Sequence, residues 1–273
     1  MTTPSLILTL LFLLIGTGQA QEKTGTDSPS LQTRQIGDIK VTWIEDRASR
    51  QGAKTFPDAG QQLLDSLGLQ EGIPSSMSTF LVETDGIKIL FDTGMGSSDS
   101  KLLPTLASMG IKPADIQYIY LTHFHGDHIG GMMEGDKPVF PNAAVYAART
   151  EYDGWMQMPA ERNTQVRKTM ETYKERLHLF QFGDKLPGKV QTLDARGHTP
   201  GHTVFQIGKL LIAGDIMHGV ALQLKRPEIC PVYDMDKAAA IASRKRILQY
   251  AKENRLLMAG MHFPTPGFLE LAK

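Results

Sequence analysis

Imidazole and carboxylate side chains are concentrated in one short stretch of this chain. Residues 121–131 read LTHFHGDHIGG and place His123, His125, Asp127 and His128 within six positions. Imidazole nitrogens and carboxylate oxygens are typical ligands of zinc and related divalent ions. Four such ligands are too crowded for one tetrahedral ion. The spacing therefore favours two adjacent ions, which in two-metal sites lie about 3.5–4 Å apart.

Three more candidate ligands follow in separate segments. His198 lies in the glycine-bounded string GHTPGH, Asp215 ends the apolar run LLIAGD, and His262 ends the run LMAGMH. Any one of them alone would more often be a hydrogen-bonded loop residue or a helix cap. Their occurrence together with the first cluster favours a metal site. The candidate metal ligands are thus His123, His125, Asp127, His128, His198, Asp215 and His262.

The elements that must position these residues are mainly strands. The hydrophobic pattern predicts strands at 39–45, 78–84, 87–92, 115–121, 142–148, 189–194, 203–207, 209–214 and 256–260. It predicts helices at 59–68, 101–109, 149–157, 161–178 and 235–254. Asp234 or Asp236 is the expected N-cap of the last helix. Each ligand segment follows a strand, and the mixture of elements predicts an α/β fold with sheets packed under helical layers.

Composition narrows the class of protein. The chain has 273 residues, of which 41% are hydrophobic and 21% charged, as in a globular protein with a large core. The 29 basic residues balance the 29 acidic ones and form no basic stripe, so we expect no nucleic-acid partner. The single cysteine, Cys230, allows no intrachain disulfide and is expected to be a small hydrophobic side chain in a loop, with a metal ligand as the alternative.

The N-terminus has the pattern of an export signal. Residues 6–15 read LILTLLFLLI, which is shorter than the roughly 20 residues of a membrane-spanning helix. Gly18 and Ala20 stand three and one positions before an expected cut. We therefore expect a periplasmic or secreted protein with no stable membrane association after cleavage. An uncleaved N-terminal anchor is the alternative.

These signals divide the chain into three parts. Residues 1–20 are predicted to be the signal peptide, and residues 21–35 a flexible lead with one large apolar side chain. Residues 36–273 are predicted to form a single folded domain.

The strings THFHGDHIGG and GHTPGHT, the aspartate of IAGD and the late His262 resemble the metallo-β-lactamase superfamily. The resemblance covers roughly residues 36–265. It implies an αβ/βα four-layer sandwich, in which two mixed β-sheets are flanked by helices. The metals would lie at one edge of the packed sheets.

The resemblance also implies how the ligands divide between two ions. The implied ligands are His123, His125 and His198 for the first ion, and Asp127, His128 and His262 for the second. Asp215 would bridge the ions together with a water or hydroxide. Asp92, in the string ILFDTG, would support the ligands through hydrogen bonds. The expected cofactors are two zinc ions per chain, with manganese, iron or cobalt as alternatives.

A finer resemblance points to methyl parathion hydrolase-like members. It is carried by GDIMHGVALQLKRPEICPVYDMDKAAAIASRKRIL, residues 214–248, and by the later HFPTPG. Those relatives continue from the last histidine into a terminal strand, whereas this chain stops at Lys273. A more open site or a differently completed sheet edge is therefore expected.

The implied reaction is hydrolysis. A hydroxide that bridges two divalent ions would attack a lactone or ester carbonyl, and N-acyl-homoserine lactone ring opening (quorum quenching) is the leading substrate assignment. Asp127 could also carry a proton to the leaving group. An aspartate at Asp215 resembles lactonases and phosphotriesterases, while zinc β-lactamases generally have Cys or Ser there. Phosphotriester hydrolysis is thus the second reading, β-lactam hydrolysis the third, and an inactive metal-binding protein the non-enzymatic alternative.

Other residues are candidates for the substrate side of the site. Acyl-homoserine lactonases of this superfamily have a tyrosine three residues after the bridging aspartate, where this chain has His218. We predict that His218 orients or polarises the substrate carbonyl; a wall residue without that role is the alternative. His202 is predicted to bond backbone rather than metal. Trp155, Met156 and Met158 form either an apolar pocket wall or part of the core. The expected partner is a small ester or lactone, and a homodimer remains open.

Overall fold

The computed structural model describes residues 30–272 of the chain. The predicted signal peptide lies outside the described residues, as does most of the predicted lead. The predicted domain start at residue 36 is wrong, because strand β1 (Leu31–Ile36) already pairs with β2 (Ile39–Gln51). None of the described helices combines the length and the apolar character that crossing a membrane requires.

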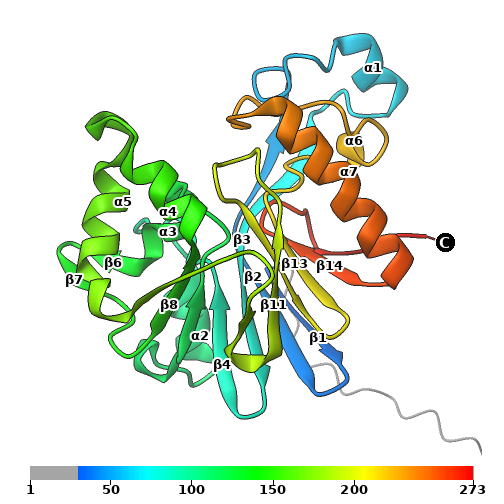
Figure 1. Cartoon of the computed structure of the whole chain (residues 1–273). Coiled ribbons are helices and arrows are strands. Elements are labelled where there is room, and N and C mark those ends of the chain that lie inside the picture. Colours follow the sequence, from blue (N-terminus) through cyan, green and yellow to red (C-terminus); the bar gives the residue numbers. More distant parts are fainter. Residues whose placement is uncertain (1–29, 273) are drawn as a thin grey trace, which may run out of the picture.

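Two mixed β-sheets form the centre of the protein (Figure 1). The first sheet has the order β1-β2-β3-β4-β5-β8-β9, antiparallel up to β4 and parallel from there on. Its further strands are β3 (Ile73–Thr84), β4 (Ile87–Phe91), β5 (Tyr118–Tyr120), β8 (Ala144–Ala148) and β9 (Leu177–Phe180). A separate two-stranded sheet pairs β6 (Met133–Glu134) with β7 (Lys137–Pro138).

The second sheet has the order β10-β11-β12-β13-β14-β15, in which only β13 and β14 run parallel. Its strands are β10 (Lys185–Leu186), β11 (Val190–Asp194), β12 (Thr203–Ile207), β13 (Leu210–Gly214), β14 (Leu257–Gly260) and β15 (Phe268–Glu270).

The α-helices of the described residues lie between these strands in the sequence. They are α1 (Gln61–Ser66), α2 (Leu102–Ser108), α3 (Gly126–Ile129), α4 (Arg149–Met156), α5 (Ala160–Thr172), α6 (Val220–Gln223) and α7 (Lys237–Asn254). Short 3-10 turns span Pro113–Asp115, Gly130–Met132, Lys174–Arg176 and Pro187–Lys189.

Three hydrophobic cores stack these elements into four layers. The middle core lies between the sheets, where Phe91 of β4 packs against Phe205 of β12 with ring centroids 5.4 Å apart. An outer core joins the first sheet to α2 and α5. The opposite outer core joins the second sheet to α7 through Ile247 and Ala251. The predicted αβ/βα sandwich of two mixed sheets flanked by helices is confirmed.

The sequence of each strand explains why it can serve two cores. Side chains alternate between the faces of a strand, so a strand buried on both faces carries a continuous apolar run. In β4, Ile89 and Phe91 face the other sheet while Leu90 faces the helices. In β13, Ile212 faces the first sheet while Leu211 faces α7.

A fourth, smaller core lies at the end of the molecule that carries α1 and α6 (Figure 1). Phe56, Leu64 and Ile73 pack there against Leu222 and Ile229. This cluster ties the segment between β2 and β3 to the segment after β13, and both segments border the site described below.

Every predicted strand is present; β12 has the predicted bounds, and the other boundaries are shifted. The prediction of a helix over 161–178 is too long, since α5 ends at Thr172 and His178 lies in β9, with its ring stacked on Tyr146. Asp236, not Asp234, caps α7 by accepting a hydrogen bond from the backbone N–H of Ala239. A strand does follow the last histidine, because β15 pairs with β14 and completes the sheet edge.

Candidate metal centre

The candidate ligands meet because parallel strands end at the same edge of each sheet. β4 and β5 run parallel in the first sheet, and they lead to Asp92 and to His123. β13 and β14 run parallel in the second sheet, and they lead to Asp215 and to His262. The two sheets pack face to face, so these four strand ends open into one volume.

Short loops bring in the remaining ligands. Asp127 and His128 lie on the single-turn helix α3, for which His125 is the N-terminal flanking residue. His198 lies in the loop between β11 and β12. α3 lies close against the loop after β4 because Gly130 has no side chain; a Cβ atom there would lie 2.0 Å from the carbonyl oxygen of Met95.

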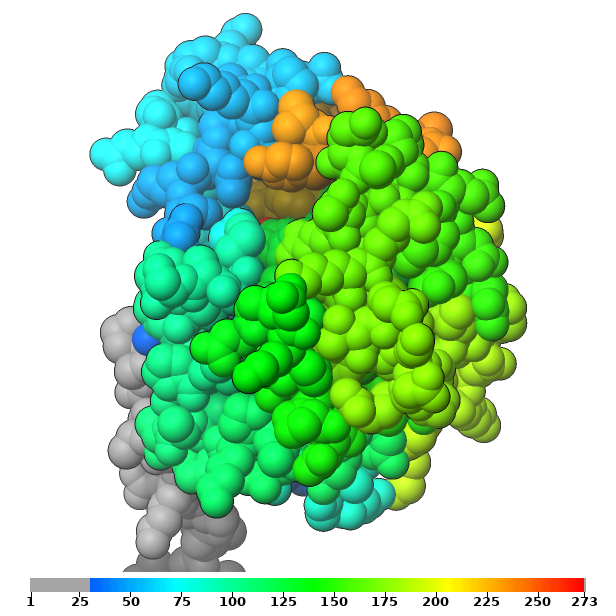
Figure 2. Space-filling model, turned by 90° about the vertical axis from the view of Figure 1, so that its left-hand side faces the viewer, coloured from blue at the N-terminus to red at the C-terminus, as the bar shows by residue number. Residues whose placement is uncertain are grey.

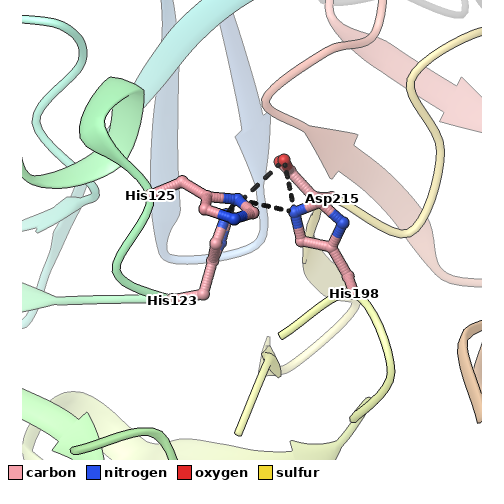
Figure 3. A group of neighbouring side chains, drawn as sticks. All are labelled: His123, His125, His198 and Asp215. Atoms are coloured by element: carbon pink, nitrogen blue, oxygen red, sulfur yellow. Dashed lines mark hydrogen bonds and ion pairs between the residues drawn. The ribbon is translucent and has the colours of Figure 1, made fainter. Parts of the chain in front are cut away.

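Four of the predicted ligands form a first cluster (Figure 3). His125 Nδ1 lies 3.0 Å from both His123 Nε2 and His198 Nε2. Asp215 Oδ2 lies 3.3 Å from His198 Nε2 and 3.6 Å from His123 Nε2. Figure 3 shows His123 and His125 on one loop, with their ring nitrogens turned toward His198 and Asp215, which come from other segments.

The other three predicted ligands form a second cluster around the same aspartate. Asp127 Oδ2 lies 3.5 Å from His262 Nε2 and 3.7 Å from His128 Nε2. Asp215 approaches both histidines, with Oδ1 3.3 Å from His128 Nε2 and Oδ2 3.1 Å from His262 Nε2. All seven predicted ligands are thus brought together, with Asp215 in contact with both clusters.

Acceptors outside the clusters fix the orientation of the imidazoles. Nδ1 of His128 lies 2.7 Å from Asp92 Oδ2, Nδ1 of His198 lies 2.9 Å from Asp234 Oδ1, and Nδ1 of His262 lies 2.7 Å from the carbonyl oxygen of Ser76. If each Nδ1–H donates outward, each Nε2 lone pair faces the centre. Ligating histidines in metalloproteins are oriented in this way.

The residues present fit divalent metal ions. Among the described residues, His128 Nε2 and Asp215 Oδ1 are buried without a hydrogen-bond partner, although they face each other. Buried acceptors of this kind require a cation or a proton between them. Two nitrogens bound tetrahedrally to one zinc ion at 2.0–2.1 Å would lie roughly 3.3 Å apart, which is close to the spacing in the first cluster.

The charges of the centre lead to the same conclusion. Burial disfavours the charged form of His128, but Asp215, Asp127 and Asp92 raise its pKa well above the ordinary value. Burial also opposes ionisation of Asp215, yet the imidazoles, His128 foremost, hold its pKa well below the usual range. The buried carboxylates therefore demand positive charge, which protons supply only partly and which divalent ions would supply in full.

Asp92 has the supporting position that was predicted for it. Its Oδ1 accepts the backbone N–H of Thr122 at 2.8 Å, and its Oδ2 accepts the Thr122 hydroxyl at 2.6 Å. The backbone of Asp92 is left-handed, with φ of 59°, which is unusual for a residue other than glycine. These bonds hold the strained residue in place, so that it can orient His128.

His202 bonds backbone rather than the metal cluster, as predicted. Its Nε2 accepts the backbone N–H of Asp215 at 2.9 Å, and its Nδ1 lies 3.1 Å from the carbonyl oxygen of Ala195. Burial, helped by His198, lowers the pKa of His202 to about 3, so the ring is neutral. Gly214, with φ of 53°, permits this contact, since a Cβ there would lie 2.4 Å from His202 Nε2.

Glu151 is a buried carboxylate of α4 that the sequence analysis did not identify. Its Oε1 accepts hydrogen bonds from the Phe124 backbone N–H at 2.9 Å and from Trp155 Nε1 at 2.6 Å. Its Oε2 accepts them from the Thr199 hydroxyl at 2.8 Å and from the Gly201 backbone N–H at 2.6 Å. One side chain therefore clamps the loop of His123 and His125 to the loop of His198. The sequence signal for this role would have been a glutamate on the buried face of α4.

Asp234 is the second missed residue. Its Oδ1 bonds His198, and its Oδ2 pairs with Arg244 Nη2 at 2.9 Å. Arg244 is itself buried and donates to the carbonyl oxygens of Ile216 and Pro227. The sequence signal was ambiguous, because an aspartate before a helix suggests a cap.

The ligands open into a cavity of about 420 Å³. Figure 2 shows a hollow where the blue N-terminal segment, the orange segment after β13 and the green segments meet. The cavity is lined by Arg47, Ser49, Gln51, Met77, Met95, His125, Gly126, Asp127, Asp215, His218, Tyr233 and His262. A cavity of this size suits a small-molecule ligand.

The suggestion that Trp155, Met156 and Met158 form the apolar wall is not supported. All three pack in or against the outer core, and none lines the cavity. Met77, Met95 and Tyr233 form the apolar wall instead.

Comparison with known proteins agrees with this geometry. The profile of the family described as the Metallo-beta-lactamase superfamily matches residues 73–258, which is more than half of the chain. The chain belongs to the metallo-β-lactamase superfamily. The predicted family and fold are thereby confirmed, and the protein is a hydrolase of this superfamily with a His/Asp metal-binding cluster.

Relatives within the superfamily include named lactonases. N-acyl homoserine lactonase AiiA of Bacillus thuringiensis subsp. kurstaki is 25% identical over 234 residues, covering 73% of this chain and 88% of the relative. A hydroxyacylglutathione hydrolase of Shewanella baltica (strain OS223) is 31% identical over 99 residues, covering 36% of this chain and 33% of the relative.

Solved structures of superfamily members share the fold. The hydrolase AbOPH superimposes with a TM-score of 0.79 at 28% identity, covering 90% of this chain and 94% of that chain. AidC, a dizinc quorum-quenching lactonase in complex with a product N-hexnoyl-L-homoserine, has a TM-score of 0.80 at 24% identity, covering 89% of this chain and 97% of that chain.

His218 lines the cavity next to two of the candidate ligands. Its Nε2 lies 3.1 Å from Asp215 Oδ2, and its ring stacks on His262 with centroids 4.5 Å apart. Burial lowers the pKa of His218 to about 4, so the ring is neutral and carries one N–H. Together with Asp215 and His262, His218 also forms a third group of side chains close enough to hold a metal ion.

Proposed function

We propose that this hydrolase uses two divalent metal ions, with zinc as the leading candidate, to open lactones or cleave esters. N-acyl-homoserine lactones are its leading substrates. The observation that carries the proposal is the position of Asp215, whose carboxylate approaches the imidazoles of both ligand clusters. The named lactonases among its relatives support the choice of substrate.

When bound, two ions would acidify water and polarise a carbonyl oxygen. His123, His125 and His198 would hold one of them, while Asp127, His128 and His262 would hold the other. Asp215 would join the two sites. The chain itself fixes this arrangement before substrate arrives, since Asp92, Asp234 and the Ser76 carbonyl orient the imidazoles.

Two side chains would act directly on the substrate. Asp127 lines the cavity and is the more exposed of the two cluster aspartates, so its carboxyl can carry a proton to the leaving alkoxide. His218 lines the same cavity, and the single N–H of its neutral ring, which faces Asp215 Oδ2 when no metal is bound, can donate to the substrate carbonyl oxygen once metal ions engage that carboxylate.

The decisive experiment measures proton release by zinc-loaded protein spanning residues 21–273. The substrates are acyl-homoserine lactones of several chain lengths, with methyl parathion and a cephalosporin at matched concentration. A lactone kcat/KM of about 10⁴ M⁻¹s⁻¹ or more supports the proposal, since that is the range of ordinary enzymes. Turnover of methyl parathion or the cephalosporin alone would replace it with phosphotriester or β-lactam hydrolysis.

Asp215→Asn separates an enzyme from an inactive metal-binding protein. The amide keeps the size of the side chain but loses the charge that the two clusters share. We expect the turnover of the best substrate to fall at least about 10³-fold, because bridging and charge balance are lost together. A wild-type protein that binds metal but turns over none of the substrates would favour the non-enzymatic alternative.

We also propose that the protein is exported and cut after Ala20. The support is the apolar run at residues 6–15 followed by Gly18 and Ala20. Expression of the full chain in a bacterial host should give periplasmic protein whose mass corresponds to a chain starting at Gln21. Full-length protein in the membrane fraction would favour the uncleaved anchor.

A further inference from the structure

One wall of the substrate cavity is lined by hydrogen-bonding side chains. Arg47, Ser49 and Gln51 alternate along β2 and all three line the cavity. Side chains two apart share a face of a strand, so the three form a continuous strip. Apart from the candidate ligands, Gly126 and His218, the rest of the lining is Met77, Met95 and Tyr233, so the strip is a polar wall beside an apolar one.

A bulge in β2 sets the position of this strip. The pairing of β2 with β3 shifts between Glu45 and Arg47, which leaves Asp46 as the extra residue. Asp46 turns to the loop after β4, where its Oδ1 accepts the backbone N–H of Lys101 at 2.8 Å. Arg47, next along the chain, faces the cavity.

The Arg47 guanidinium is held in place but only partly used. Its Nη2 donates to Asp99 Oδ2 at 3.0 Å, and Asp99 Oδ1 accepts the Ser97 hydroxyl at 2.7 Å. A guanidinium has five N–H donors. Asp99 is the only hydrogen-bond or ion-pair partner of the Arg47 side chain among the described residues. Most of its donors are therefore available to a ligand.

Gln51 also presents donors. Its Oε1 accepts the Thr55 hydroxyl at 2.7 Å, which leaves the amide N–H groups as its unused polar atoms. Ser49 adds a hydroxyl to the strip. The wall thus offers N–H and O–H groups to whatever lies against it, and an acceptor-rich ligand matches it.

Charge in the cavity favours the same kind of ligand. The positive charge of two divalent ions would exceed the negative charge of Asp127 and Asp215. The negative charge of Asp99 is offset by Arg47, its ion-pair partner. The loaded cavity would therefore be positive and would attract anions. A plain alkyl chain laid against Arg47 would displace water from its N–H groups without replacing the lost hydrogen bonds.

We propose that the preferred substrates are lactones or esters whose acyl part ends in a carboxylate, and that Arg47 determines this specificity by binding it. The proposal rests on the function proposed above and names its substrate class. It predicts that a dicarboxylic acyl group is favoured over an alkanoyl group of the same length.

The test compares N-glutaryl-homoserine lactone with N-hexanoyl-homoserine lactone, whose acyl chains match in length when one carboxylate oxygen is counted in place of the terminal methyl carbon. We expect the wild-type kcat/KM to be about tenfold or more higher for the glutaryl lactone at low ionic strength. The preference should shrink in 0.5 M salt, which screens partly exposed charges. Arg47→Met should bring the ratio of the two kcat/KM values close to one, mainly through the KM of the glutaryl lactone.

Arg50→Met provides the matched control. Arg50 lies three residues along the same strand, does not line this cavity and donates to the Gly72 carbonyl oxygen. The Arg50→Met substitution removes the same charge outside the cavity, so the ratio of the two kcat/KM values should stay at its wild-type value. A wild-type enzyme without the preference, or an Arg47→Met enzyme that keeps it, overturns the inference.

Binding of non-hydrolysable lactams separates this inference from the proposed function. The glutaryl and hexanoyl lactam analogues are titrated calorimetrically into zinc-loaded wild type and Arg47→Met. If neither lactone is turned over, the proposed function fails, and the lactams still decide the role of Arg47. Tighter binding of the glutaryl lactam by wild type alone supports the inference. Equal affinities, or no binding of either lactam, overturn it.

Discussion

Asp234 bonds His198 with one carboxylate oxygen and the buried Arg244 with the other, at 2.9 Å in both contacts. A candidate metal ligand is therefore linked to α7 through a single side chain. Burial opposes the charge on Asp234, but His198 and Arg244 lower its pKa to about 2, so the residue is ionised. Arg244 depends on this charge, since its other acceptors are backbone carbonyl oxygens and the sulfur of Cys230, none of which is a carboxylate.

Asp234→Asn should weaken both the fold and the metal site. The amide keeps its volume but leaves the Arg244 charge buried without a counterion, a loss that costs about 3–5 kcal/mol. The melting temperature should fall by roughly 6–20 °C. Metal affinity should fall about 10–100-fold, as for other residues that orient a ligand. Calorimetry and metal titration measure the two effects.

Asp236→Asn is the control for this prediction. It makes the same substitution two residues away, at the N-cap of α7, where asparagine caps as well as aspartate. Its melting temperature and metal affinity should match those of wild type. Equal behaviour of the two variants would show that the Asp234 contacts contribute nothing special.

Glu151→Gln should loosen the two loops that carry His123, His125 and His198. The new NH2 group replaces an oxygen that accepts two buried hydrogen bonds, so two donors lose their partner. At about 1–3 kcal/mol for each unsatisfied donor, unfolding should become easier by roughly 2–6 kcal/mol. Denaturant titration of the zinc-loaded protein measures this loss. Glu161→Gln, at an exposed position of α5, should change stability by less than about 0.5 kcal/mol.

The ligand set was predictable because its signals are local. Apolar runs that end at Asp92, Asp215 and His262 identify strand ends. His123 and His125 are only two residues apart, so their side chains are expected on the same side of one loop. The partners of these ligands depend on tertiary packing instead. Asp234 precedes a helix and resembles a cap. Glu151 lies in a helix whose other residues are mostly polar, so its sequence does not indicate which face is buried.

Strand lengths were also less predictable where they depend on pairing with another strand. β2 extends to Gln51, beyond the apolar pattern that ends near residue 45, because pairing with β3 continues through polar residues. That extension supplies Arg47 to the cavity, so the pattern missed a wall of the site. β15 is a three-residue edge strand that pairs with β14, and so short a segment gives no recognisable strand pattern in the sequence.

His218→Ala should lower turnover without removing metal. The variant deletes a cavity-lining ring that contacts Asp215 and His262. Removal of one preorganised donor to a carbonyl oxygen typically costs 10²–10³-fold in kcat, and we expect a loss in this range. Metal analysis should still find the wild-type content, which distinguishes substrate contact from metal binding. Unchanged kcat would assign His218 to the wall, and lost metal would assign it to the ligand set.

Metal removal should destabilise the fold as well as abolish activity. Without cations the ring nitrogens of His123, His125 and His198 approach one another closely, and the carboxylates of Asp127 and Asp215 lose their counter-charge. A ligand present at a thousandfold excess over its Kd stabilises the folded state by about 4 kcal/mol. Treatment with a chelator should therefore lower the melting temperature by roughly 8–16 °C.

The same experiment on Asp215→Asn tests whether one residue joins the two ion sites. The variant keeps the other six ligands but loses the carboxylate that approaches both clusters. Its chelator-induced shift should be smaller than that of wild type, because weaker binding contributes less to stability. Zinc should restore wild type fully, with two ions per chain by metal analysis. A wild-type melting temperature that is the same with and without metal would contradict a buried, charge-compensating metal centre at these strand ends.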